Sequence, residues 1–214
     1  MNHLVALVVA LLLLAVAGPA AVLGEDGTPA VGTFPVTPDP AECRVTPRTI
    51  EEFLVISAGA TPVAAAPVAT AVEVPLGEAA DAETVAGVNA SAQEIVACFN
   101  AGDFPRAFSL FSANLLRQIA ADGPIREDAV RAILFARPEV VPVEERTTLL
   151  AVTDVTELGN GRAGAFLATT DPPSGPDTIY VIFAQEDDRW LMHDAVEFLV
   201  PGGGNEEGEG RPAA

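Results

Sequence analysis

The chain has 214 residues, half of them hydrophobic, and its 30 acidic against 11 basic residues give a formal net charge of −19. This length holds one ordinary domain with additional segments rather than two full domains. The acidic balance disfavours nucleic acids and anionic lipid surfaces as partners, because like charges repel. The two histidines are isolated, and no catalytic-triad, phosphate-loop or dinucleotide motif occurs, so we expect neither a metal nor a cofactor.

An apolar run opens the chain. It begins at Leu4 and is followed by Gly18, Pro19 and further small residues, a pattern typical of a secretory signal peptide. The stretch from Leu4 to Leu23 is also about long enough to span a bilayer as an uncleaved anchor. We therefore expect residues 1–24 to be a signal peptide or N-terminal anchor of an exported protein, with no other membrane association.

Residues 25–80 are rich in proline and alanine, a composition that prevents long helices and predicts a linker. One island interrupts it at residues 42–54. There, Thr49 and Glu52 have the spacing of a capping box, which predicts a short helix with Ile50 and Phe53 on its apolar face. We interpret the island as a docking segment, and a recognition motif is the alternative.

Three helices are predicted after residue 81. Apolar residues recur at helical spacing over residues 85–99, and Gly102 follows the end of this run. Asp103 can cap a second helix that continues to Asp122, and a third helix is predicted near residues 125–136. The second helix has an apolar stripe formed by Phe104, Phe108, Phe111, Leu115 and Ile119.

Four runs with strand-like alternation follow, over residues 146–158, 162–170, 177–185 and 190–198. The first two meet through Gly159-Asn160-Gly161, a strong hairpin signal because Asn-Gly supports positive φ. The third strand is apolar on both faces, which requires a cover on the second face. Helices followed by an antiparallel meander indicate an α+β fold, and the glycine- and glutamate-rich residues 201–214 are predicted to form a disordered acidic tail.

Two stretches resemble the nuclear transport factor 2-like superfamily, including its polyketide-cyclase-like branch. The run from Ala92 to Phe104 (AQEIVACFNAGDF) is similar to the family's first helix, Gly-Asp turn and second helix. The run from Asp188 to Asp194 (DRWLMHD) resembles its last hairpin, where a tryptophan opens the closing strand. The resemblance covers about residues 82–200, within a domain expected to span residues 81–200. It implies three N-terminal helices packed on a strongly curved antiparallel sheet, a cone-shaped, cystatin-like roll with a pocket at its open end.

Dimers are frequent in this family, so the resemblance implies a homodimer partner as the cover of the third strand. The segment at residues 42–54 is the intramolecular alternative. The motifs that carry the resemblance are architectural rather than catalytic, and they do not specify an activity.

The last strand raises the main question about a site. If the strand is regular, Asp194 shares its face with four apolar residues, Trp190, Met192, Val196 and Phe198. A carboxylate in such a place must be hydrogen-bonded or protonated. Asp194 is then a general base or ligand anchor at the pocket floor. The alternative is a structural role, in which its carboxylate is hydrogen-bonded within the protein or exposed at a strand end. His193 points to the opposite face and is assigned to the surface or an interface.

Asp154 interrupts the first strand in a similar way, and Tyr180 is the only tyrosine. Some enzymes of the superfamily combine an acid with a tyrosine or histidine across the pocket. By that resemblance, Asp194 or Asp154 would be the general base of a small-molecule dehydratase, isomerase or cyclase, with Tyr180 beside it. The predicted ligand pocket, suited to a small apolar ligand, comprises Phe108, Phe111, Tyr180, Trp190, Met192 and Asp194.

The only two cysteines are Cys43 and Cys98. Cys98 lies beside the buried stripe of the first helix, where a segment crossing the domain can reach it. Export would place both thiols in an oxidising compartment. A Cys43–Cys98 disulfide is therefore expected, closing a loop of about 56 residues and contributing about 4 kcal/mol in the chain-entropy model. Two free thiols are the alternative.

Three functions remain open at this point. The first is an exported, non-enzymatic domain whose pocket binds a ligand or partner. The second is the small-molecule enzyme, which requires polar side chains that converge in one pocket. The third is a dimeric interaction module that works through the outer face of the sheet. The positions of Asp154, Tyr180 and Asp194 distinguish among them.

Overall fold

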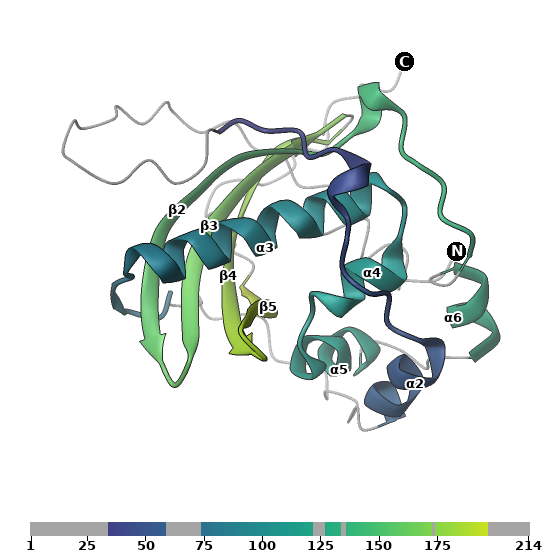
Figure 1. The fold of residues 1–214 in the computed structure, drawn as a ribbon, viewed down its shortest axis with the longest axis horizontal. Helices are drawn as coiled ribbons and strands as arrows, with labels where there is room; N and C mark the ends of the chain where they lie inside the picture. The colour runs from purple at the N-terminus through teal and green to yellow at the C-terminus, as the bar shows by residue number, and fades with distance from the viewer. Residues whose placement is uncertain (1–33, 59–73, 122–126, 134–135, 173, 197–214) are drawn as a thin grey trace, which may run out of the picture.

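The computed structural model describes residues 34–58, 74–121, 127–133, 136–172 and 174–196. In this part of the chain, helices gather against one face of an open, antiparallel sheet of five strands (Figure 1). The α+β class is thus confirmed. The expected signal peptide or anchor at residues 1–24 and the expected tail at 201–214 lie outside the described residues.

The described helices follow the predicted order with one difference. They are α2 (Ile50–Ala58), α3 (Ala82–Asn100), α4 (Phe104–Ser109), α5 (Ala113–Ala121) and α6 (Glu127–Ile133), with short 3-10 turns η1 (Pro40–Glu42) and η2 (Val143–Glu145). Asp81 and Asp103 cap α3 and α4 through their carboxylates, which accept hydrogen bonds from the backbone N–H groups of Thr84 and Arg106.

The prediction of one helix from Asp103 to Asp122 is wrong, because the chain leaves the helix between α4 and α5 to meet the sheet. The Met192 N–H donates to the Leu110 carbonyl at 2.8 Å, and the Ser112 N–H donates to the Met192 carbonyl at 2.9 Å. Ser112 then starts α5, its Oγ accepting from the Leu115 N–H. The phenylalanine stripe continues across this break, so local periodicity does not reveal it.

The strands are β1 (Glu78–Ala79), β2 (Thr148–Gly159), β3 (Arg162–Asp171), β4 (Gly175–Glu186) and β5 (Arg189–Val196), in spatial order β1-β2-β3-β4-β5. The four predicted strands are confirmed, and the short β1 is additional. The predicted β2–β3 hairpin is also confirmed: Gly159 pairs with Arg162, and Asn160 and Gly161 have φ values of 53° and 66°.

The inner face of the sheet, defined here as the face toward the helices, carries the core. Its residues include Ala163, Ala165, Leu167, Val181, Phe183, Trp190 and Met192, packed with Val88, Ala92 and Ile95 of α3. Trp190 lies directly on Gly87 of α3, where a Cβ atom would come within 2.3 Å of the indole ring. Only glycine allows this close approach of helix and ring.

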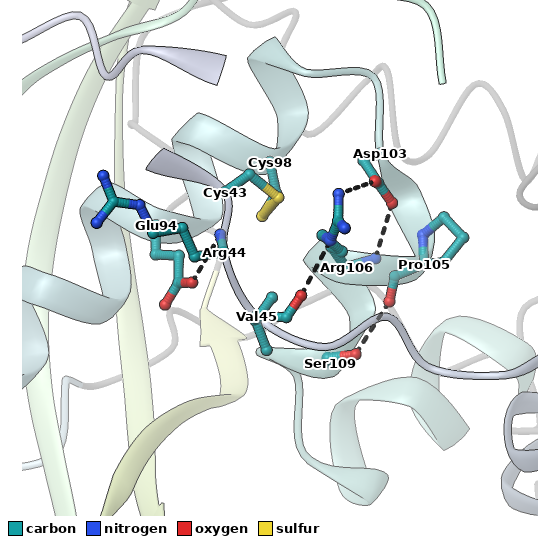
Figure 2. A network of polar contacts seen from close by, with 9 residues as sticks. All are labelled: Cys43, Arg44, Val45, Glu94, Cys98, Asp103, Pro105, Arg106 and Ser109. Carbon is teal, nitrogen blue, oxygen red and sulfur yellow. Dashed lines mark hydrogen bonds and ion pairs between the residues drawn. A yellow bond between two sulfur atoms is a disulfide. The ribbon is translucent and has the colours of Figure 1, made fainter. Parts of the chain in front are cut away.

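Residues 34–58, called the strap below, pack along the helical layer. The sulfur atoms of Cys43 and Cys98 are bonded, which confirms the predicted disulfide. Arg106 of α4 pairs with Asp103 at 2.9 Å, and its Nε donates to the Val45 carbonyl of the strap (Figure 2). Nearby, the Arg44 N–H donates to Glu94 of α3 (Figure 2).

The strap ends in α2, which covers α5 and α4. Phe53 is fully buried, and its ring stacks on that of Phe108 with centroids 5.5 Å apart. The predicted capping box is confirmed, since the Thr49 N–H donates to Glu52 and the Glu52 N–H donates to the Thr49 hydroxyl. The packed unit therefore includes residues well before the expected domain start at 81.

Candidate functional site

The strand that carries Asp194 is not regular. Met192 lies opposite Phe183 and Asp194 lies opposite Ile182, so His193 is an extra residue and forms a β-bulge. The bulge reverses the alternation beyond it. Asp194 consequently lies on the outer face, away from the helices, whereas Trp190 and Met192 face the core. This corrects the expectation from a regular strand that all three share one face.

On the outer face Asp194 is half-buried, and its Oδ1 accepts a hydrogen bond from the Ala195 N–H at 2.9 Å. The apolar neighbour Val196 lies on the same face, opposite Tyr180, while Phe198 lies outside the described residues. The Asp194 carboxylate thus accepts a hydrogen bond at Oδ1 and lies on the side of the sheet opposite the predicted pocket.

Tyr180 also occupies the outer face and is only 1% exposed. Its ring meets that of Phe166 edge-on, and its hydroxyl donates to the Pro75 carbonyl at 3.4 Å. The hydroxyl covers Gly164, where a Cβ atom would lie 1.8 Å from the phenolic oxygen. Tyr180 is therefore a packing residue of the outer layer rather than a member of an inner pocket.

The expected cover on the second face of the third strand is present, since Tyr180 and Ile182 are both buried there. Part of it is the chain's own segment at residues 74–77, which contributes the Pro75 carbonyl. The segment at residues 42–54 is not this cover, because it packs on the helices at the other side of the sheet. A homodimer partner on the outer face stays a prediction.

Asp154 lies on β2, two strands away from Tyr180. It is exposed, has a φ of 51°, and belongs to a second bulge, in β2 between Thr153 and Thr156. Val155 in the same bulge packs toward the core. The polar interruptions in both strands thus coincide with bulges, and neither carboxylate enters the helix-facing layer.

The other predicted pocket residues lie in the core. Phe108, Phe111, Trp190 and Met192 are each at most 9% exposed. The Phe108 and Phe111 rings contact each other at 5.7 Å between centroids, and Phe53 of the strap packs on the first of them. These four side chains are brought together on the helix side of the sheet, without Asp154, Tyr180 or Asp194.

A carboxyl pair that the sequence reasoning missed does lie on the inner face. β3 and β4 pair without a register shift, so Thr169 and Asp177 continue the face of Leu167 and Ile179. Asp171 follows on the same face at the end of β3. The sequence did contain a signal for this position of Asp177. It lies an even number of residues before the core residues of its strand and therefore projects from the same face.

The environment of this pair shifts the pKa of one member, Asp177, upward. Partial burial raises the pKa of Asp177, and the charge of Asp171 raises it further, against a hydrogen bond from the Thr178 N–H that lowers it. The Ser174 hydroxyl donates to Oδ2 of Asp171 at 3.1 Å. The other oxygen of Asp171, Oδ1, is buried and has no hydrogen-bond partner among the described residues.

Two carboxyl groups at the end of an apolar floor can hold a hydrogen-bond donor or an amine, and a carboxyl with a raised pKa can also transfer a proton. In the described ranges, no group of three or more His, Cys, Asp or Glu residues is placed to hold a metal ion. The helices of this part of the chain include none that is long and apolar enough to cross a membrane.

No family model, curated protein or solved structure matches the chain.

Proposed function

We propose that this protein is an exported, non-catalytic binding domain that holds a small ligand between its helices and the inner face of its sheet. In this proposal the sheet is strongly curved and the domain is the cone-shaped roll implied by the resemblance to the nuclear transport factor 2-like superfamily. The supporting observation is that Leu167 and Ile179 continue on one face into Asp171 and Asp177. An apolar floor that ends in carboxyl groups suits an amphipathic ligand with an apolar body and an amine or hydroxyl group.

Export is part of the proposal, with residues 1–24 acting as signal peptide or N-terminal anchor. The disulfide between Cys43 and Cys98 supports it. Disulfides persist in oxidising compartments and are rare where thiols are kept reduced.

Binding is favoured over catalysis because none of the three polar residues expected to converge lies in the helix-facing layer. Asp154 is exposed at a bulge, and Asp194 and Tyr180 lie on the outer face. A dehydratase, isomerase or cyclase activity is the second candidate, and it now depends on Asp177. The observations in its favour are the position of Asp177 near Asp171 on the inner face and the upward shift of its pKa, since a positioned carboxyl can act as a general acid or base.

The test uses two single-chain probes of similar length whose head groups carry opposite charges, octylamine and octanoate. The amide signals of Thr169 and Asp177 in the 15N-labelled protein report binding, because these two residues lie opposite each other at the proposed site. We expect octylamine to give a saturable change and octanoate to give none at the same concentration. Asp177→Asn should weaken octylamine binding about tenfold, the scale of one charge-assisted hydrogen bond.

Asp154→Asn is the matched control, because it removes the same charge from an exposed position. It should leave the octylamine affinity unchanged. Equal losses in the two variants would mean that octylamine responds to the overall charge, and the proposed site would be abandoned. A change in the amide signals of Thr169 and Asp177 that never saturates would lead to the same conclusion.

A further inference from the structure

A shallow hollow lies at the edge of the sheet, where the chain enters β1. It is called the edge hollow below and is lined by Leu76, Gly77, Glu78, Glu157, Leu158 and Gly159. β1 pairs with the far end of β2, so the hollow adjoins the β2–β3 hairpin rather than the proposed ligand site. Glu157 pairs with Ala163 and Asp177 pairs with Thr169, so the hollow lies at the other end of β3 from the proposed ligand site and is separate from it.

One wall of the edge hollow is apolar and unusually exposed. Leu76 is 98% exposed, the highest value among the exposed large hydrophobic residues of the described ranges. Leu158 beside it is half-buried. A Cβ at Gly159 would meet no atom within 4 Å, so the space in front of this glycine is open. A partner that covers Leu76 would remove a whole leucine side chain from water, which favours association.

The other wall is acidic. Glu78 lies directly opposite Glu157 in the antiparallel pair, and directly opposite residues project from the same face about 5 Å apart. Like charges in this position repel, and neither glutamate has an ion-pair partner in the described part of the chain. The exposed Asp81, which caps α3, and Glu83 in the first turn of that helix follow in the chain and add negative charge.

Basic groups near the hollow are few. Arg162 lies across the hairpin, opposite Gly159, and is exposed. With a net charge of −19, two copies of this chain repel each other, so a second copy is disfavoured as the occupant. Charge complementarity to Glu78 and Glu157 favours a basic partner. The exposed Leu76 favours a partner that also offers an aliphatic surface.

We propose that the edge hollow docks an arginine-bearing, extended segment of a basic partner protein. The aliphatic stem of an arginine packs on Leu76 while its guanidinium group donates hydrogen bonds to Glu78 and Glu157. The planar fork of five N–H donors matches two adjacent carboxylates better than the single ammonium of lysine. Docking also relieves the repulsion between the two glutamates.

The experiment titrates the 15N-labelled protein with the peptide acetyl-Arg-Leu-Arg-Leu-Arg-amide. The comparison peptide has citrulline in place of each arginine, which keeps the shape and removes the charge. We expect the amide signals of Gly77 and Gly159 to shift saturably with the arginine peptide, and the citrulline peptide to bind at least tenfold more weakly. Leu76→Ser and Glu78→Gln should each weaken binding of the arginine peptide at least fivefold.

The control variants are Val143→Ser and Glu144→Gln, which alter a 72% exposed valine and the adjacent carboxylate elsewhere on the surface. They should not change the affinity. Losses equal to those of Leu76→Ser and Glu78→Gln, or shifts spread evenly over acidic residues, would overturn the proposal. A dimer in sedimentation that Leu76→Ser dissociates would also overturn it, by assigning the hollow to a second copy. The amide spectrum reports folding, and if Leu76→Ser unfolds the protein, Glu78→Gln carries the test.

Discussion

Asn100 shows how a single side chain at the end of a helix joins segments that are distant in the sequence. It is 1% exposed, its Nδ2 donates to the carbonyls of Pro38 and Thr147, and its Oδ1 accepts from the Thr147 N–H. Asn100→Ala should lower the free energy of unfolding by about 2–3 kcal/mol, because buried backbone groups lose their partners. Asn114→Ala is the control, because half-buried Asn114 makes one long hydrogen bond, to the His193 carbonyl. Urea unfolding measures both variants, and an equal loss of unfolding free energy in the two would contradict this account.

Asp177 should make stability depend on pH with a defined sign. Its pKa in the folded protein is raised, so folding favours the protonated form. That contribution is present below the pKa of an unfolded aspartate, about 3.9, and is lost as pH rises through the higher folded pKa. At pH 7 the charged Asp177 therefore lowers stability relative to a neutral side chain.

Asp177→Asn should consequently raise the free energy of unfolding at pH 7, by less than about 1 kcal/mol because solvent screens this partly exposed group. The gain should vanish near pH 3, where the native carboxyl is already protonated. Urea unfolding at both pH values measures the difference, with Asp154→Asn as the comparison for loss of a surface charge. A gain that is the same at pH 3 and pH 7 would refute the assignment.

At the scale of elements, the two hairpin turns offer a direct comparison. The β2–β3 turn places Gly161 at a φ of 66°, where glycine has no steric cost. The β4–β5 turn instead places Asp187 and Asp188 at φ values of 48° and 60°. Asp188→Gly should therefore stabilise the protein by about 1 kcal/mol, and Gly161→Asp should destabilise it by a similar amount. Thermal unfolding measures both, and changes of the same sign would show that turn conformation is not the cause.

Local signals in the sequence were sufficient for much of the fold. The capping box at Thr49, the cap at Asp103 and the Asn-Gly hairpin all involve contacts within a few residues, and all are present. The face of the sheet on which a side chain lies was harder to predict. The extra residue His193 in β5 reverses the inward and outward alternation of the residues that follow it. A polar residue on an apolar face and a bulge produce the same interruption in a sequence.

Long-range contacts were not predictable in the same way. The break between α4 and α5 depends on backbone hydrogen bonds that Leu110 and Ser112 make with Met192, about eighty positions away. The local pattern there remains helical. The carboxyl pair was missed for a related reason. Asp171 falls between the predicted strands at residues 162–170 and 177–185, and only the uninterrupted β3–β4 register places it beside Asp177 on the inner face.

At the scale of the whole molecule, the strap unites the two layers. Val36 exchanges two backbone hydrogen bonds with Leu149 of β2, Cys43 is bonded to Cys98 of α3, and Phe53 stacks on Phe108 of α4. Along the strap, the first of these contacts is with the sheet and the later two are with helices on its inner side (Figure 1). The strap is therefore part of the folded core, although its composition resembles a linker.

Deleting residues 34–58 from the full chain, with Cys98→Ala to avoid a free thiol, should abolish cooperative unfolding. The deletion removes the disulfide, worth about 4 kcal/mol, and the buried Phe53, worth about 3 kcal/mol, from a domain whose total stability is about 5–15 kcal/mol. Urea unfolding followed by Trp190 fluorescence measures the outcome. The control is Cys43→Ala/Cys98→Ala, which removes the covalent link but keeps the strap, and it should unfold cooperatively at a lower midpoint. If the deletion and the control unfold at the same midpoint, the packing of Phe53 adds nothing and the strap acts only through its disulfide.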